Sequence, residues 1–86
     1  MVQAGQNLIG NRVKQARHLL SPPMTQAELS SKLSKLGVSI DRAGIAKVET
    51  GIRGVLDFEL VAVAASLEVS VLWLLGLSPN PSPERR

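Results

Sequence analysis

The side chains in this chain that could do chemistry are mostly cationic, and they gather in its first part. Of the 86 residues, numbers 1–53 hold eight Lys and Arg side chains against three acidic ones, a net charge of +5. Residues 54–86 hold two basic and four acidic side chains, a net charge of −2. A basic segment of this kind favours a polyanionic ligand, and nucleic acid is the usual one. Charge alone leaves open the alternative of a solvated basic surface.

Cysteine and histidine, which often act as nucleophiles or bind metals, are much scarcer than Lys and Arg. The sequence has no cysteine, which excludes disulfides and thiolate metal sites, and His18 is its single histidine. We find no activated nucleophile, no paired carboxylates and no glycine loop for phosphate. Two aromatic residues are too few for a base-stacking platform, which argues against single-stranded or RNA ligands. The sequence thus predicts a protein that is not an enzyme and uses no cofactor and no metal.

Helical signals recur along the chain and predict an all-α fold of five short helices. Apolar residues at every third or fourth position indicate a first helix over about residues 7–20. The other four helices are indicated by residues whose side chains can cap a free backbone N–H at a helix start. These capping residues are Thr25, Asp41, Asp57 and Ser70. No stretch alternates polar and apolar residues over the length of a convincing strand.

The two ends of the chain differ in composition from this helical region. Residues 1–6 are small and polar and are expected to be flexible, and the Pro- and Ser-rich residues 78–86 are expected to be disordered. The span 7–77 is then one helical domain. The chain has no signal-peptide pattern and no apolar run near the ~20 residues of a membrane span, so we expect a cytoplasmic protein without membrane contact.

Four short motifs occur in an order and spacing that is fairly specific. They are Thr25-Gln26-x-Glu28-Leu29, Ile45-x-x-Val48-Glu49-x-Gly51-x-Arg53, Asp57-Phe58-Glu59-Leu60 and Leu67-Glu68-Val69-Ser70-x-Leu72. On these residues the chain resembles the lambda-repressor-like helix-turn-helix family, which includes phage repressors and xenobiotic-response-element-type regulators. The resemblance covers roughly residues 9–75. The chain departs from the commonest pattern over residues 34–41, where the connection is several residues longer than the usual turn.

The resemblance implies that the second and third helices form a unit that binds double-stranded DNA, with the third helix in the major groove. Arg42, Ala43 and Lys47 would then face base edges. A guanidinium such as that of Arg42 can bond guanine O6 and N7 in a fork, worth about 1–3 kcal/mol of discrimination. The plainer alternative is that these three are simply exposed residues of a surface helix.

Further residues take their expected roles from the same resemblance. Thr25 and Gln26, at the start of the second helix, and Arg53, beyond the third, are expected to contact DNA phosphates. Arg17 and Glu49 are expected to form a partly buried ion pair that fixes the first helix on the third. That pair would have a role in stability and would not contact DNA.

The last predicted helix is apolar all round, so its own domain can bury only part of it. We expect Leu72, Trp73 and Leu75 to form a dimer interface, and the alternative is that the first helix or the N-terminal segment covers them. The sequence therefore predicts a homodimeric, sequence-specific, double-stranded-DNA-binding transcriptional regulator, most often a repressor. The alternative function is an antitoxin or adaptor module whose main role is to bind a protein partner.

Overall fold

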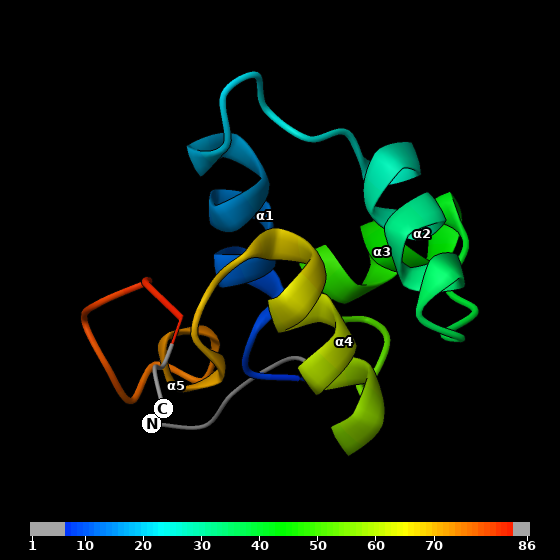
Figure 1. The fold of residues 1–86 in the computed structure, drawn as a ribbon. Helices are drawn as coiled ribbons and strands as arrows, with labels where there is room; N and C mark the ends of the chain where they lie inside the picture. Colours follow the sequence, from blue (N-terminus) through cyan, green and yellow to red (C-terminus); the bar gives the residue numbers. More distant parts are fainter. Residues whose placement is uncertain (1–6, 84–86) are drawn as a thin grey trace.

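The first helix of the chain lies across the third and the fourth, and a fifth short helix closes one end (Figure 1). The structure, a computed structural model, describes residues 7–83, and within them it has five helices and no strand, which confirms the predicted all-α class. The helices are α1 (Gly10–Leu19), α2 (Gln26–Lys35), α3 (Arg42–Glu49), α4 (Asp57–Leu67) and α5 (Val71–Leu74). No helix in this span has the length and apolar character to cross a membrane. The expected flexibility of residues 1–6 lies outside the described residues.

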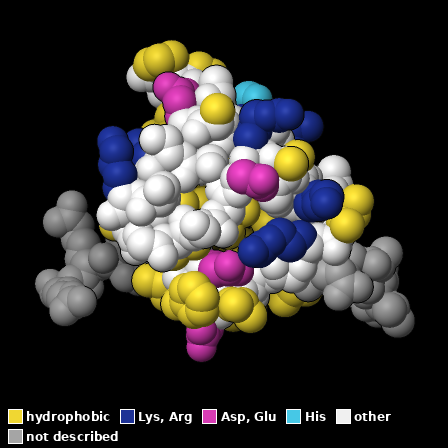
Figure 2. Space-filling model, turned by 90° about the vertical axis from the view of Figure 1, so that its right-hand side faces the viewer, with side chains coloured by type: hydrophobic (Ala, Val, Ile, Leu, Met, Phe, Trp, Pro, Cys, Tyr) yellow, Lys and Arg dark blue, Asp and Glu magenta, His cyan; other side chains and the backbone are white. Residues whose placement is uncertain are grey.

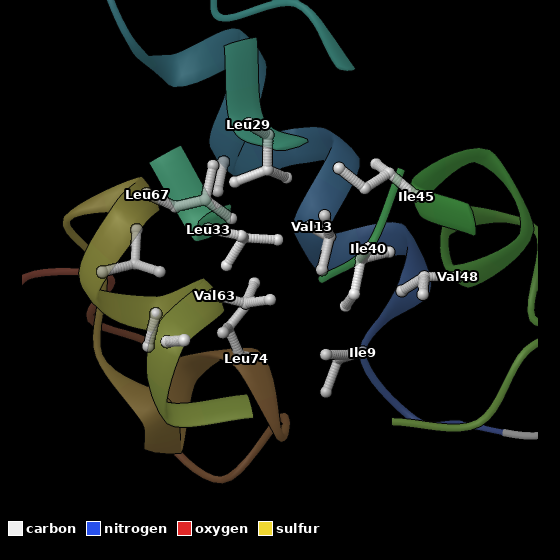
Figure 3. Close-up of a cluster of buried hydrophobic side chains, with 14 of the residues drawn as sticks. Ile9, Val13, Leu29, Leu33, Ile40, Ile45, Val48, Val63, Leu67 and Leu74 are labelled. Atoms are coloured by element: carbon white, nitrogen blue, oxygen red, sulfur yellow. The ribbon is translucent and has the colours of Figure 1, made fainter. Parts of the chain in front are cut away.

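One apolar core joins the five helices. Side chains from different helices meet in its centre, as Figure 3 shows. Those excluded most completely from solvent include Val13, Leu29, Leu33, Ile45, Leu67 and Leu74. Because the core takes two or more residues from nearly every helix at three- to four-residue spacing, each helix is fixed in rotation about its own axis.

The start of α1 lies against the end of α3, closer than a side chain would allow. A Cβ atom on Gly10 would lie only 2.5 Å from the backbone oxygen of Val48. Asn7 fixes the same junction: its Oδ1 accepts the Gly10 N–H, and its Nδ2 donates to the carbonyl oxygens of Val48 and Arg53. The helix therefore begins at Gly10, three residues later than predicted. Asn7 lies outside the helix, and its side chain links the start of α1 to the end of α3.

The long connection between α2 and α3, residues 36–41, is part of the core. Gly37 ends α2 with a φ of 81°, a left-handed conformation that suits glycine. Val38 and Ile40 then turn inward and are buried. Ser30 of α2 donates from Oγ to the carbonyl oxygen of Ile40 at 2.7 Å. The extra residues therefore add buried apolar surface and a hydrogen bond between α2 and the segment that leads into α3.

Three of the four predicted capping residues are confirmed, those at Thr25, Asp41 and Ser70. The prediction for α4 is wrong: Asp57 is its first helical residue, and Leu56 holds the capping position. Leu56 has no polar side chain that could accept an N–H of the first turn, and its own N–H donates to Glu59 Oε1 at 2.9 Å. The carboxylate of Asp57 accepts the N–H of its neighbour Phe58.

Residues 78–83, the described part of the tail that was expected to be disordered, lie against the start of α5. The N–H of Ser70 donates to the carbonyl oxygen of Pro81 at 2.9 Å. Two side-chain turns shape the segment, in which Ser78 Oγ and Asn80 Oδ1 each accept the backbone N–H two residues on. The last three residues of the expected tail, 84–86, lie outside the described part.

Candidate nucleic-acid interface

The exposed face of α3 carries Arg42, Ala43 and Lys47, the three residues expected to face base edges. Helix geometry accounts for their exposure, because Ile45 and Val48 of the same helix point into the core. Within the described part of the chain, the side chains of Arg42 and Lys47 make no ion pair and no hydrogen bond. Both cations are therefore free to interact with a ligand.

The start of α3 depends on a glycine and an aspartate. Asp41 Oδ1 accepts the N–H of Gly44 at 2.7 Å. A Cβ atom on Gly44 would lie 2.9 Å from Ile40 Cγ2 and 3.0 Å from Asp41 Oδ1. Because Gly44 has no side chain, the carboxylate of Asp41 has room to cap α3. This cap fixes the start of α3, where Arg42 lies.

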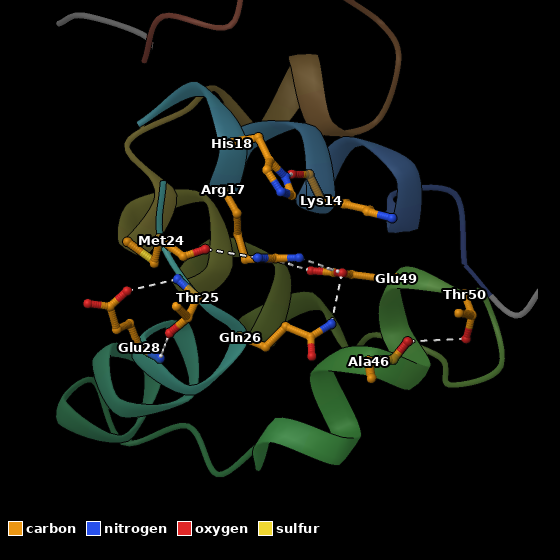
Figure 4. A network of polar contacts seen from close by, with 10 residues as sticks. All are labelled: Lys14, Arg17, His18, Met24, Thr25, Gln26, Glu28, Ala46, Glu49 and Thr50. Carbon is orange, nitrogen blue, oxygen red and sulfur yellow. Dashed lines mark hydrogen bonds and ion pairs between the residues drawn. The ribbon is translucent and has the colours of Figure 1, made fainter. Parts of the chain in front are cut away.

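Arg17 and Glu49 form a buried ion pair between α1 and α3 (Figure 4), the pair that the resemblance implied. Arg17 Nε lies 2.6 Å from Glu49 Oε2, and Nη2 lies 2.9 Å from Oε1. The remaining terminal nitrogen, Nη1, donates to the carbonyl oxygen of Met24 at 2.8 Å. The guanidinium therefore connects α1, α3 and the segment that leads into α2.

Gln26 belongs to the same network, which fixes its side chain at the start of α2. Its Nε2 donates to Glu49 Oε1 at 3.1 Å, and the second Nε2 proton stays without a partner in the described chain. The neighbouring Thr25 is exposed and engaged in the cap: its Oγ1 accepts the N–H of Glu28, and its own N–H donates to Glu28 Oε1. These bonds to Thr25 lower the pKa of Glu28 below its ordinary value. Both expected phosphate ligands thus lie at one helix start, close to α3.

Arg53 has a strong internal partner that sequence reasoning missed. Its Nη1 and Nη2 each lie 3.1 Å from one carboxylate oxygen of Glu59, and Nη1 also donates to the carbonyl oxygen of Gly54. The hydrogen bonds from Arg53 hold the pKa of Glu59 below its ordinary value, and those same bonds raise the pKa of Arg53. One third of the Arg53 side chain remains exposed. A phosphate could therefore reach only the exposed part of the Arg53 side chain, while the pair with Glu59 stays in place.

Figure 2 views the molecule from the side on which α2 and α3 lie in Figure 1. Lys and Arg side chains gather mostly on one half of this face, and acidic side chains lie among them. A group of hydrophobic side chains lies along the lower edge. The face is therefore a mixed polar surface with separate cations, and it is not one continuous basic patch.

The expected dimer residues are not exposed together. Trp73 is buried, with the Arg12 guanidinium 4.7 Å from its ring centroid and Arg12 Nη1 bonded to its carbonyl oxygen. Leu75 is half-buried, and Leu72 is 45% exposed. Trp73 is therefore not available to the expected dimer interface, because α1 covers this side of α5, as the alternative for this segment had it. Of the three residues, Leu72 is the one available to a second molecule.

Comparisons of the chain with known protein families, with curated proteins and with solved structures found no match. The functional interpretation therefore rests on the residues and their geometry. Within residues 7–83 no group of three or more His, Cys, Asp or Glu side chains is arranged so that it could hold a metal ion.

Proposed function

We propose that this protein binds double-stranded DNA in a sequence-specific way and regulates transcription, with α2 and α3 as a helix-turn-helix of the lambda-repressor-like kind. The observation that carries the proposal is the outer face of α3, where Arg42 and Lys47 are exposed and unpartnered within the described chain. Helices that are anchored on one side and carry free hydrogen-bond donors on the other are the usual readers of the major groove.

The dimensions of α3 suit this role. An α-helix with its side chains is about 10–12 Å across, close to the width of the major groove of B-DNA, about 12 Å. Arg42 in the first turn bonds a guanine edge in a fork, and Lys47 lies little more than one turn further along. Ala43 between them touches a thymine methyl or leaves room for a close approach. Gln26 and Thr25 contact the phosphates that flank the groove.

Two copies would read a partly palindromic site. In a dimer of this kind, two copies of α3 enter successive major grooves about 34 Å apart. Leu72 of α5 is exposed and apolar, as is Leu77 just beyond that helix, and both support a contact between copies at this end of the molecule. A dimer bound across a promoter competes with transcription, which makes repression the simplest mode of regulation.

Selection of bound sequences from a random DNA pool tests the proposal. We expect an enriched, partly symmetric site. With that site, Arg42→Ala should relax the preference at one base pair by about 1–3 kcal/mol. Lys35→Ala is the matched control, since it also removes one exposed cation, from the last turn of α2 and outside α3, and it should leave base preference unchanged. Equal affinity of the unaltered protein for selected and random DNA would sink the proposal.

A protein-binding function has one specific observation in its favour. Leu56, Phe58 and Val61, at and just before the start of α4, are each close to 60% exposed. Exposed apolar groups of this size often mark a partner surface. An antitoxin or adaptor module would use this end of α4, and purification of the tagged protein after nuclease treatment distinguishes the two functions. A stoichiometric protein partner, together with no enrichment of any DNA site, favours the module.

A further inference from the structure

A polar hollow of about 520 Å³ opens between α1, the start of α2 and the end of α3. Two of its walls, formed by Gln26 and by the end of α3, belong to elements already assigned to the interface. The third wall is α1, which contributes Asn11, Lys14 and Arg17. The hollow is lined by Asn11, Lys14, Arg17, Gln26, Ala46, Glu49 and Thr50. Figure 4 shows most of these side chains, with Lys14 on the α1 side.

The net charge of the lining is positive, and Lys14 is its source. Arg17 and Glu49 neutralise each other through their two-pronged pair. Lys14 is exposed and makes no ion pair in the described part of the chain. An anion in the hollow therefore meets one uncompensated positive charge at the rim.

The hollow also contains hydrogen-bond donors without partners, which likewise favour an anionic ligand. Lys14 offers three N–H protons and Asn11 two, and no interaction within the described residues uses them. Gln26 has one Nε2 proton left, because the other is bonded to Glu49. Thr50 is different, since its hydroxyl donates to the carbonyl oxygen of Ala46 within α3. The available donors thus come from α1 and α2, and an oxyanion could accept from both.

The walls of the hollow are held in a fixed relation to one another. The Arg17–Glu49 pair joins α1 to α3, and the Glu49–Gln26 bond joins α3 to the start of α2. At the other end of α1, Gly10 lies directly on the backbone of α3. Of the donors in the hollow, Gln26 is thus held in place before binding, and it loses little entropy when a ligand arrives.

We propose that this hollow seats one phosphate of the DNA backbone, which Lys14 and Asn11 hold from α1 and Gln26 holds from α2. The inference rests on the proposed function and adds α1 to the DNA-binding surface. A phosphate contact fixes the position of the protein on the duplex and carries no sequence information. Lys14 therefore strengthens binding to every sequence and sets how α3 enters the groove.

The salt dependence of DNA binding by the full chain tests this contact. We expect Lys14→Gln to weaken binding to selected and random DNA alike, and to reduce the slope of log affinity against log salt by about 0.9 for each bound copy, about 1.8 for a dimer. Lys32→Gln is the matched control, because Lys32 is an exposed lysine of α2 outside the hollow. It should leave the slope unchanged. Asn11→Asp, which also brings the net charge of the lining to zero, should likewise weaken binding to every sequence.

Methylphosphonate substitution locates the contact on the DNA. Each phosphate of the selected site is made neutral in turn. For the unaltered protein, neutralising the seated phosphate should lower affinity, and with Lys14→Gln that loss should shrink at the same position.

The outcomes separate the inference from the function on which it rests. Suppose that Arg42→Ala changes base preference, while Lys14→Gln and Lys32→Gln show the same loss of affinity at every neutralised phosphate. The proposed phosphate contact is then wrong, and the proposed function stands. If no site is preferred but Lys14→Gln reduces the salt slope and Lys32→Gln does not, the phosphate contact of Lys14 is supported and base reading fails. Failure of the unaltered protein to bind any DNA overturns both.

Discussion

Arg17 of α1 and Glu49 of α3 are joined at two points, 2.6 Å and 2.9 Å long, and their side chains are only 9% and 5% exposed. A charged group this far from water is stable only with its partner in place. Because the same guanidinium donates to the carbonyl oxygen of Met24, the pair also holds the segment before α2. This one ion pair therefore joins three segments of the fold.

Glu49→Gln should therefore be strongly destabilising. It leaves the Arg17 guanidinium buried without a counter-charge, and we expect the free energy of unfolding to fall by about 3–5 kcal/mol. Urea denaturation followed by circular dichroism measures the loss. The double variant Arg17→Met/Glu49→Leu removes both charges, so it should lose less than the single variant. An unchanged midpoint for Glu49→Gln would contradict the assigned role.

Gly10→Ala should also destabilise the protein, although alanine is normally the better helix residue. The new Cβ would meet the backbone oxygen of Val48 at 2.5 Å, and backbone cannot rotate aside as a side chain can. We expect a loss of about 1–3 kcal/mol, as for overpacking elsewhere. The same urea denaturation measures whether the free energy of unfolding falls or rises. A rise would mean that α1 and α3 are packed less closely than the structure shows.

Local signals made much of the fold predictable. A capping residue and its N–H partner lie within three residues of each other, so Thr25, Asp41 and Ser70 were recognisable from sequence. The rotation of α3 was also predictable, because buried Ile45 and Val48 leave Arg42 and Lys47 on the other side. Both kinds of inference need only helix periodicity and neighbouring residues.

Contacts that cross the fold were not predictable in the same way. Arg53 and Glu59 lie on either side of a loop, and nothing in their spacing shows that the loop brings them together. Trp73 was expected in a dimer interface because α5 is apolar all round, and sequence does not say that Arg12 of α1 covers it. Asp57 was expected to cap α4, and sequence does not show that the helix begins one residue earlier, with the N–H of Leu56 bonded to Glu59.

The left-handed residue at the end of α4 offers a stabilising substitution. Glu68 has a φ of 59°, a conformation that costs a residue with a Cβ roughly 1–2 kcal/mol. Glycine avoids that cost but loses more entropy on folding, so Glu68→Gly should raise the free energy of unfolding by about 0.5–1 kcal/mol. Glu68→Ala removes the charge and keeps the strain, and it should show no such gain. A thermal melt of both variants measures the difference.

The Arg53–Glu59 pair should make stability fall in acid. Hydrogen bonds from Arg53, and a further one from the Leu56 N–H, lower the pKa of Glu59 in the folded protein. A carboxylate with a lowered folded pKa contributes its full stabilisation above the unfolded pKa and loses it as the pH falls through the folded one. Glu59→Gln should therefore be less stable than the unaltered protein near neutral pH, and this difference should narrow below about pH 4.5, the ordinary glutamate value. Urea midpoints over a pH series give stability against pH for the unaltered protein and for Glu59→Gln. Parallel curves would show that the protonation of Glu59 does not affect stability.

Trp73 gives the chain an optical reporter of its own. It is the single tryptophan in the sequence, and its buried indole lies between α1 and α5 under the guanidinium of Arg12. Indole emission shifts to longer wavelength when the ring meets water, so fluorescence follows the separation of these two helices without any attached dye. Because the ring is enclosed at this junction and not on the outer face of α3, loss of the fold and occupation of that face should produce different optical signals in one sample.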